Sequence, residues 1–159
     1  MMLFFKFNSL SFFSSLGESG RTPLGLAIWN QNCHLVPILL DSGAKIDIKD
    51  IFGRVPLQYA SFQSCNPCTK LVISSQTVNL EDKYGRTALH LAAQERFLDG
   101  LSLLKDNGAT FLSDDEGQTP LHRAAIYSTP ETVELLLDLF KDCNLNQEDN
   151  KGRTALDYV

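Results

Sequence analysis

The strongest constraint on this chain is a nine-residue stretch that recurs at a nearly constant interval. Residues 85–93 read GRTALHLAA, and residues 117–125, which begin 32 positions later, read GQTPLHRAA. Related stretches begin at Gly20, Gly53 and Gly152, so the intervals between successive starting glycines are 33, 32, 32 and 35 residues. A period in this range predicts a solenoid, because each copy is one supersecondary unit that must stack on its neighbours to bury its apolar face.

Each copy contains the residue types expected of two short helices followed by a projecting turn. The opening glycine permits a turn that a Cβ would hinder. A threonine then stands where its hydroxyl can cap a helix, and a proline occupies the first helical position, where a missing N–H does no harm. A Leu-rich segment follows, and a glycine just after it predicts a left-handed helix stop. The threonines are Thr22, Thr87, Thr119 and Thr154, the prolines are Pro23, Pro56 and Pro120, the second segments are residues 35–40, 71–73, 101–104 and 133–137, and the stops are Gly43 and Gly108.

This arrangement resembles the ankyrin repeat, in which Thr-Pro-Leu-His-x-Ala precedes a Leu-rich helix, Gly-Ala and a Val-Asn-x-x-Asp-like tail. The resemblance covers residues 20–159 and implies an all-α ankyrin-repeat solenoid of four full repeats and a truncated fifth. Because terminal repeats need polar caps, a last repeat that stops in its first helix indicates a fragment of a longer protein. The expected repeats are residues 20–52, 53–84, 85–116, 117–151 and the truncated 152–159, after an apolar, Ser-rich leader at residues 1–19.

The copies diverge from the family pattern at the motif histidine, at the glycine between the helices and, in one repeat, at the Gly-Ala stop. The motif histidine is present as His90 and His122, whose rings the resemblance places between backbone groups of adjacent turns in a structural role. The glycine that usually joins the two helices is absent from the first four repeats. The second repeat also lacks the Gly-Ala stop, so we expect it to be the least stable. Gly25, Gln58 and Asp157 replace the histidine, and Gln31, Ser64, Arg96 and Ser128 replace the glycine.

Composition excludes several classes of function. A formal net charge of -5 argues against a general nucleic-acid binder, which needs a dense basic face. No run approaches the roughly 20 apolar residues of a membrane span. Four cysteines and no Asn-x-Ser/Thr sequon favour a reducing compartment, and hence a cytoplasmic or nuclear protein. The alternative is a secreted repeat protein in which the leader is a signal peptide.

Few residues carry the signature of catalysis or of a cofactor. No phosphate-binding glycine loop is present, so we predict a protein that is not an enzyme and binds no cofactor. Cys65 and Cys68 form a CxxC, and with Cys33 and His34 they are an alternative metal-ligand set, although thiols without a role are the favoured interpretation. The acidic loop tips and the arginines that follow the repeat glycines, Arg54, Arg86 and Arg153, predict an exposed Asp–Arg ladder whose pairs each contribute about 0–1 kcal/mol.

The resemblance implies protein binding through the loop tips and the outer ends of the first helices, on the concave side of the stack. Trp29, Phe52, Phe62 and Tyr84 crowd into the first half and predict one continuous aromatic patch, unless they pack under the leader or a neighbouring loop. Acidic tips at residues 114–116 favour a partner with basic residues. The predicted partner-binding residues are Trp29, Ile51, Phe52, Phe62, Lys83, Tyr84, Asp115, Glu116, Ile126 and Tyr127.

The predicted function is a monomeric, non-catalytic scaffold that binds a partner protein. The alternative is the cytosolic ankyrin segment of a larger membrane channel or multidomain enzyme. The resemblance also implies a modification site, because Val78-Asn79 with Leu71 eight residues before it is similar to the asparaginyl hydroxylation site of many ankyrin repeats.

Overall fold

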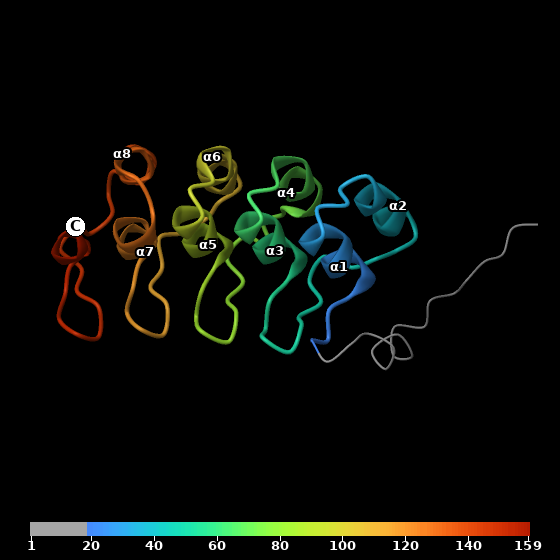
Figure 1. Cartoon of the computed structure of the whole chain (residues 1–159), viewed down its shortest axis with the longest axis horizontal. Helices are drawn as coiled ribbons and strands as arrows, with labels where there is room; N and C mark the ends of the chain where they lie inside the picture. The colour runs from blue at the N-terminus through green and yellow to red at the C-terminus, as the bar shows by residue number, and fades with distance from the viewer. Residues whose placement is uncertain (1–18) are drawn as a thin grey trace, which may run out of the picture.

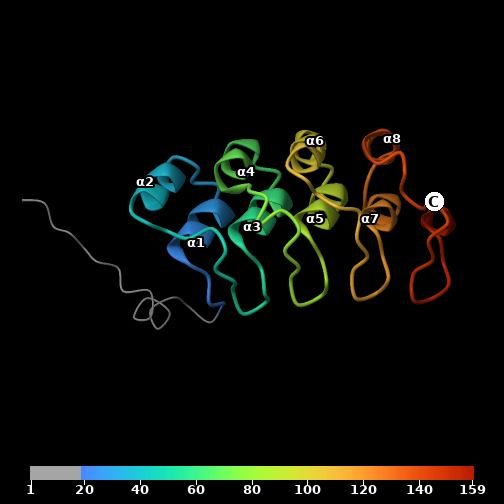
Figure 2. The ribbon, with the colours of Figure 1, turned by 180° about the vertical axis from the view of Figure 1, so that it is seen from behind.

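The computed structural model describes residues 19–159, so the expectations for the leader lie outside the described residues except at Ser19. Within this part the chain forms α-helices and one short 3₁₀ helix but no strand, as predicted. The first helices of the repeats form one row and the second helices form another, while the connecting loops project from one edge (Figures 1 and 2). The elements are α1 (Pro23–Trp29), α2 (Leu35–Asp41), α3 (Pro56–Phe62), α4 (Asn66–Val72), α5 (Ala88–Gln94), α6 (Leu98–Asp106), α7 (Pro120–Tyr127), α8 (Pro130–Leu139) and η1 (Ala155–Tyr158).

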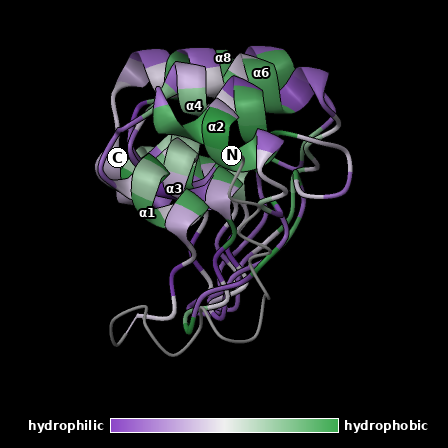
Figure 3. Ribbon diagram, turned by 90° about the vertical axis from the view of Figure 1, so that its right-hand side faces the viewer, coloured by the Kyte–Doolittle hydropathy of each residue, from purple (hydrophilic) through white to green (hydrophobic). Residues whose placement is uncertain are grey.

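Stacking stabilises these helices, because segments of seven to ten residues are too short to be stable alone in water. Equivalent leucines of the first helices, Leu24, Leu57 and Leu89, are 1% exposed or less and form the centre of the core. Seen along the stack, apolar residues concentrate in the helices, whereas the projecting loops are mostly polar (Figure 3). None of the described helices is long and apolar enough to span a membrane.

The turns between paired helices keep a left-handed backbone even without glycine. Gln31, Ser64 and Arg96 have φ values of 56°, 51° and 60°. A residue other than glycine in this conformation destabilises the fold by about 1 kcal/mol relative to glycine. These three repeats therefore retain the family turn at some cost in stability. Ser128 differs, with φ -117° and ψ -161°, and its hydroxyl donates to Thr132 Oγ1 at 2.8 Å instead.

In repeats two, three and four, a polar side chain at the motif histidine position joins the first helix to the next loop. In the third repeat, His90 Nδ1 accepts from Thr87 N at 3.1 Å and Nε2 donates to Gln118 O at 3.1 Å. His122 makes the same bridge to Arg153 O, as predicted from the resemblance. Burial lowers the pKa of His90 to about 4, so its ring is neutral near pH 7.

Gln58 makes the equivalent bridge in the second repeat. Its Oε1 accepts from Val55 N at 2.9 Å, and its Nε2 donates to Arg86 O at 2.7 Å and to Leu80 O at 3.1 Å. This substitution therefore preserves the link to the following loop, because an amide, like a neutral imidazole, carries one acceptor and a donor on the opposite side.

The predicted pairs of loop aspartates with Arg54, Arg86 and Arg153 form, but the aspartates are buried, so the expectation that this ladder is exposed is wrong. Asp82 Oδ1 accepts from the backbone N–H groups of Tyr84 and Arg86, and Oδ2 accepts from the Arg86 guanidinium at 2.7 Å. Each carboxylate thus closes its own loop from inside. The equivalent residues Asp50, Asp82, Asp114 and Asp149 are 8%, 7%, 6% and 6% exposed.

Candidate protein-binding surface

Backbone hydrogen bonds tie successive loop tips into one rigid edge. Lys83 N donates to Phe52 O at 2.9 Å, and Asp115 N donates to Tyr84 O at 3.0 Å. Asn150 N continues the series by donating to Glu116 O at 2.9 Å. The loops project one for each repeat (Figure 1), and these hydrogen bonds fix the spacing of their tips.

All ten residues predicted to bind a partner are at least partly exposed. At the loop tips, Ile51, Phe52, Lys83, Tyr84, Asp115 and Glu116 are exposed. At the ends of the first helices, Phe62 and Tyr127 are exposed, whereas Trp29 and Ile126 are partly buried.

The ends of α1 and α3 carry an aromatic stack. The rings of Trp29 and Phe62 are nearly parallel, with an interplanar angle of 10° and centroids 5.7 Å apart. Tyr59, which sequence reasoning did not include, meets the edge of Trp29 at a centroid distance of 6.0 Å. Partial packing of Trp29 against these rings explains why it is less exposed than Phe62.

Two arginines extend this stack toward the first loop tip. The Arg21 guanidinium carbon lies 4.2 Å from the centroid of the Trp29 ring and 5.4 Å from that of Tyr59. Arg54 lies 5.2 Å from Tyr59 and 4.6 Å from Phe52. We call this group, from Phe52 through Arg54, Tyr59, Arg21 and Trp29 to Phe62, the basic-aromatic cluster.

Guanidinium groups, and not ring contacts alone, thus connect Phe52 to Trp29 and Phe62, whereas Tyr84 lies outside this group, so the rings do not form one continuous patch. Among the described residues, no ring pair connects Phe52 or Tyr84 to Trp29 or Phe62, and Tyr84 lies instead against Arg86 at 4.8 Å. A guanidinium that stacks on two rings is attracted to both faces. The arginine that follows the repeat glycine was visible in the sequence, but its stacking depends on a ring nearby in space.

Hydrogen bonds among Tyr59, Asp50 and Arg54 fix the position of the basic-aromatic cluster. The Tyr59 hydroxyl donates to Asp50 Oδ2, and the same oxygen accepts from Arg54 Nη2 at 3.0 Å. Burial and this hydrogen bond raise the pKa of Tyr59 well above its ordinary value, so the hydroxyl stays protonated and donating. Arg54 is consequently oriented before any partner arrives.

One loop tip in the second half of the stack is acidic. Asp115 and Glu116 are exposed at the tip between the third and fourth repeats. Asp114, which the sequence placed on the same acidic tip, is buried and accepts from Arg123 Nη2 at 2.6 Å, so it presents no charge to a partner. Tyr127 lies nearby on the helix row, where it borders an open hollow of about 400 Å³ with Gln94, Glu95 and Arg96.

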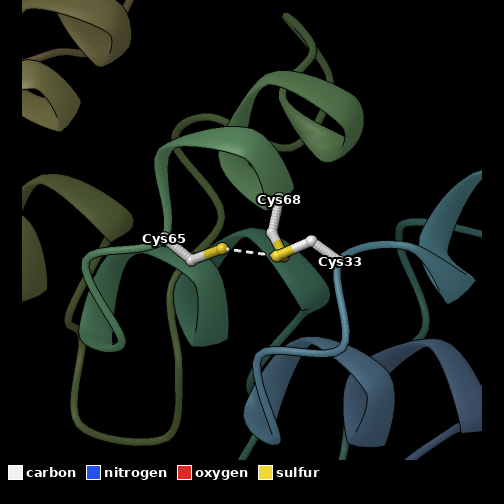
Figure 4. A group of neighbouring side chains, drawn as sticks. All are labelled: Cys33, Cys65 and Cys68. Atoms are coloured by element: carbon white, nitrogen blue, oxygen red, sulfur yellow. Dashed lines mark hydrogen bonds between the residues drawn. A yellow bond between two sulfur atoms is a disulfide. The ribbon is translucent and has the colours of Figure 1, made fainter.

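The cysteines do not fit the interpretation that they lack a role. Cys33 and Cys68 form a disulfide between the first two repeats, and Cys65 Sγ lies 2.7 Å from Cys33 Sγ (Figure 4). Of the four residues in the alternative metal-ligand set, the structure brings together these three, whereas His34 is not part of the group. Cys68 lies in the first turn of α4, which begins at Asn66.

Comparison with known families agrees with this architecture. The family described as ankyrin repeats (3 copies) matches residues 24–115 and 102–159. A search of curated proteins finds no significant match. Ankyrin repeats are typically protein–protein interaction modules and are usually non-catalytic. Since the matched residues span most of its length and the helices stack as that pattern implies, this chain belongs to the ankyrin repeat family.

Proposed function

We propose that this chain is a non-catalytic scaffold that binds a partner protein through its loop tips and the ends of its first helices. The observation that carries the proposal is a row of exposed aromatic side chains on this side of the stack. Phe52, Phe62, Tyr84 and Tyr127 are 36%, 37%, 53% and 49% exposed. Aromatic and arginine side chains dominate the binding energy of protein interfaces.

The rigid edge supports binding for a second reason. Each loop tip is hydrogen-bonded to the next, and each buried aspartate closes its own loop. Ordering of loops and side chains usually subtracts from binding free energy. Because these groups are already ordered, the chain loses little conformational entropy when a partner docks.

The charge distribution indicates the chemistry of the partner. Exposed Asp115 and Glu116 would pair with basic residues, while Trp29 and Phe62 would accept an apolar side chain. We place the interaction in the cytoplasm or nucleus, an assignment supported by the absence of N-glycosylation sequons from the sequence.

The test is affinity capture with two matched double variants. Phe52→Ser with Tyr84→Ser removes two exposed aromatic residues from the loop tips. Ile38→Ser with Leu71→Ser removes two exposed apolar residues from α2 and α4, in the other helix row. Both must retain the wild-type circular dichroism spectrum.

We expect a partner captured by the wild type to be retained by the α2/α4 variant. Its affinity for the loop-tip variant should fall about 30-fold or more, since two hot-spot residues that each contribute roughly 1–2 kcal/mol are removed. Equal retention by both variants would place the binding surface elsewhere. Loss only in the α2/α4 variant would assign binding to the second helices.

A further inference from the structure

Three cysteines from two repeats converge on one point near the junction of the first and second repeats. Cys33 lies in the turn that precedes α2, Cys65 directly precedes α4, and Cys68 is in the first turn of that helix. Their sulfur atoms all lie within 4.8 Å of one another (Figure 4). Cys68 is fully buried, and the other two are partly buried.

A disulfide accounts for only two of these sulfurs. Cys33 and Cys68 are bonded, and the free Cys65 sulfur is held 2.7 Å from Cys33 Sγ, inside ordinary contact distance for two sulfurs that share no bond. Reduction of the disulfide would therefore leave three thiols crowded at one position. Such crowding is relieved if the three sulfurs bind the same atom.

We propose that the reduced chain binds one thiophilic metal ion of the zinc class through the thiolates of Cys33, Cys65 and Cys68. Zinc–sulfur bonds of about 2.3 Å place tetrahedral thiolate ligands roughly 4 Å apart, which the cluster reaches by small sulfur movements. The Cys65-x-x-Cys68 spacing supplies two ligands from one helix start, and Cys33 closes the site from the preceding repeat. The fourth position is left to water or an external ligand.

The donor set selects the class of ion. All three ligand atoms are sulfur, and the group contains no carboxylate or imidazole. Soft thiolates favour zinc or cuprous ions, whereas magnesium and calcium require oxygen ligands. The disulfide and the metal complex are then alternative states of the same three residues.

The chemistry of interconversion balances. A phosphine or thiol reductant supplies two electrons, and two protons are taken up as the Cys33–Cys68 bond breaks. Binding of Zn²⁺ then displaces one proton from each of three thiols. The first two repeats are cross-linked in both the disulfide and the metal-bound state. The ion therefore provides in a reducing compartment the cross-link that the disulfide provides in an oxidising one.

The experiment uses the full chain, reduced with a phosphine and titrated separately with Co²⁺ and Zn²⁺. We expect one equivalent of cobalt to produce the thiolate-to-cobalt charge-transfer absorption and the visible bands of a tetrahedral site, both abolished by Zn²⁺. Cys65→Ser should weaken zinc affinity at least 100-fold, because it removes one of three ligands but leaves the disulfide pair intact. Cys143→Ser, which alters a cysteine outside the cluster, and His34→Ala should bind as the wild type does.

A second measurement on the wild type does not depend on the folding of a variant. Zn²⁺ should protect Cys33, Cys65 and Cys68 from alkylation by iodoacetamide, while Cys143 remains reactive, as mapped by mass spectrometry. Absence of both cobalt absorption and protection would overturn the proposal. So would binding that Cys143→Ser reduces as much as Cys65→Ser, or a Cys33–Cys68 bond that the reductant fails to open.

Discussion

The contribution of the contact between successive loop tips to stability can be measured by replacing one glycine with alanine, which adds a single methyl group. Gly85 opens the third repeat at φ +72°, and a Cβ there would lie 2.7 Å from Asp115 N and 2.6 Å from Asp115 Oδ1. Gly108 has a similarly left-handed φ of +88°, but a Cβ there would meet nothing within 4 Å. Gly85→Ala and Gly108→Ala therefore share the backbone strain and differ in the contact with the next loop.

The expected magnitudes follow from this difference. Alanine in a left-handed conformation destabilises the fold by about 1–2 kcal/mol, which applies to both variants. At Gly85 the methyl group also displaces Asp115 and breaks its hydrogen bond to Tyr84 O, at a further loss of about 1 kcal/mol. We expect the unfolding free energy to fall by roughly 2–3 kcal/mol in Gly85→Ala and by about 1–2 kcal/mol in Gly108→Ala.

The assay is urea denaturation followed by circular dichroism, with hydrogen exchange of individual amides as the local readout. The Asp115 amide should lose protection in Gly85→Ala and keep it in Gly108→Ala. Equal destabilisation of the two variants, with unchanged Asp115 protection, would refute the reasoning. The loop tips would then be neighbours without contributing to stability.

Three further predictions concern single side chains. Gln58→Ala leaves Val55 N and Arg86 O without their buried partner and should lower the unfolding free energy by about 2 kcal/mol in urea denaturation. Gln58→His should keep most of the wild-type unfolding free energy. Because burial lowers the pKa of His90 from 6.5 to about 4, only the unfolded ring gains a proton between these values. The free energy of unfolding should thus decrease by about 3 kcal/mol as the pH falls from 6.5 to about 4. His90→Gln should remove most of that decrease, and an unchanged pH profile in this variant would show that His90 is not its source. The peptide that contains Asn79, from cell-derived protein, should gain the mass of one oxygen atom, and uniformly unmodified peptide would exclude hydroxylation.

Residues that act within one repeat were predictable. The prolines at helix starts and the Leu-rich second segments act through neighbours a few positions away. Of the predicted capping threonines, Thr22 and Thr119 accept from a backbone N–H three residues on, whereas Thr87 and Thr154 bond a side chain at that position instead. Thr22 Oγ1, for example, accepts from Gly25 N at 3.1 Å, as its place before a proline predicts. The second helix of repeat two was predicted less well, because α4 begins before the apolar segment at residues 71–73.

Residues that act between repeats were not predictable in detail. Gln58 looked like a loss of the motif histidine, yet it spans the same gap to a carbonyl 28 residues away. The acidic tips looked uniformly exposed, yet Asp114 turns inward to Arg123. A carboxylate at a loop can face water or backbone donors, and hydropathy does not distinguish these outcomes.

The sequence by itself determined the period, the helix pairs, the left-handed turns and the family, because these depend on local backbone preferences and on an apolar pattern repeated in register. Only the tertiary structure decided that guanidinium groups join the aromatic rings of the first two repeats and that three cysteines meet at one point. Stacking brings Cys33 to Cys68 and Arg21 to Tyr59, although the members of each pair belong to different repeats. Side-chain direction at a repeat junction depends on the packing of both neighbours at once.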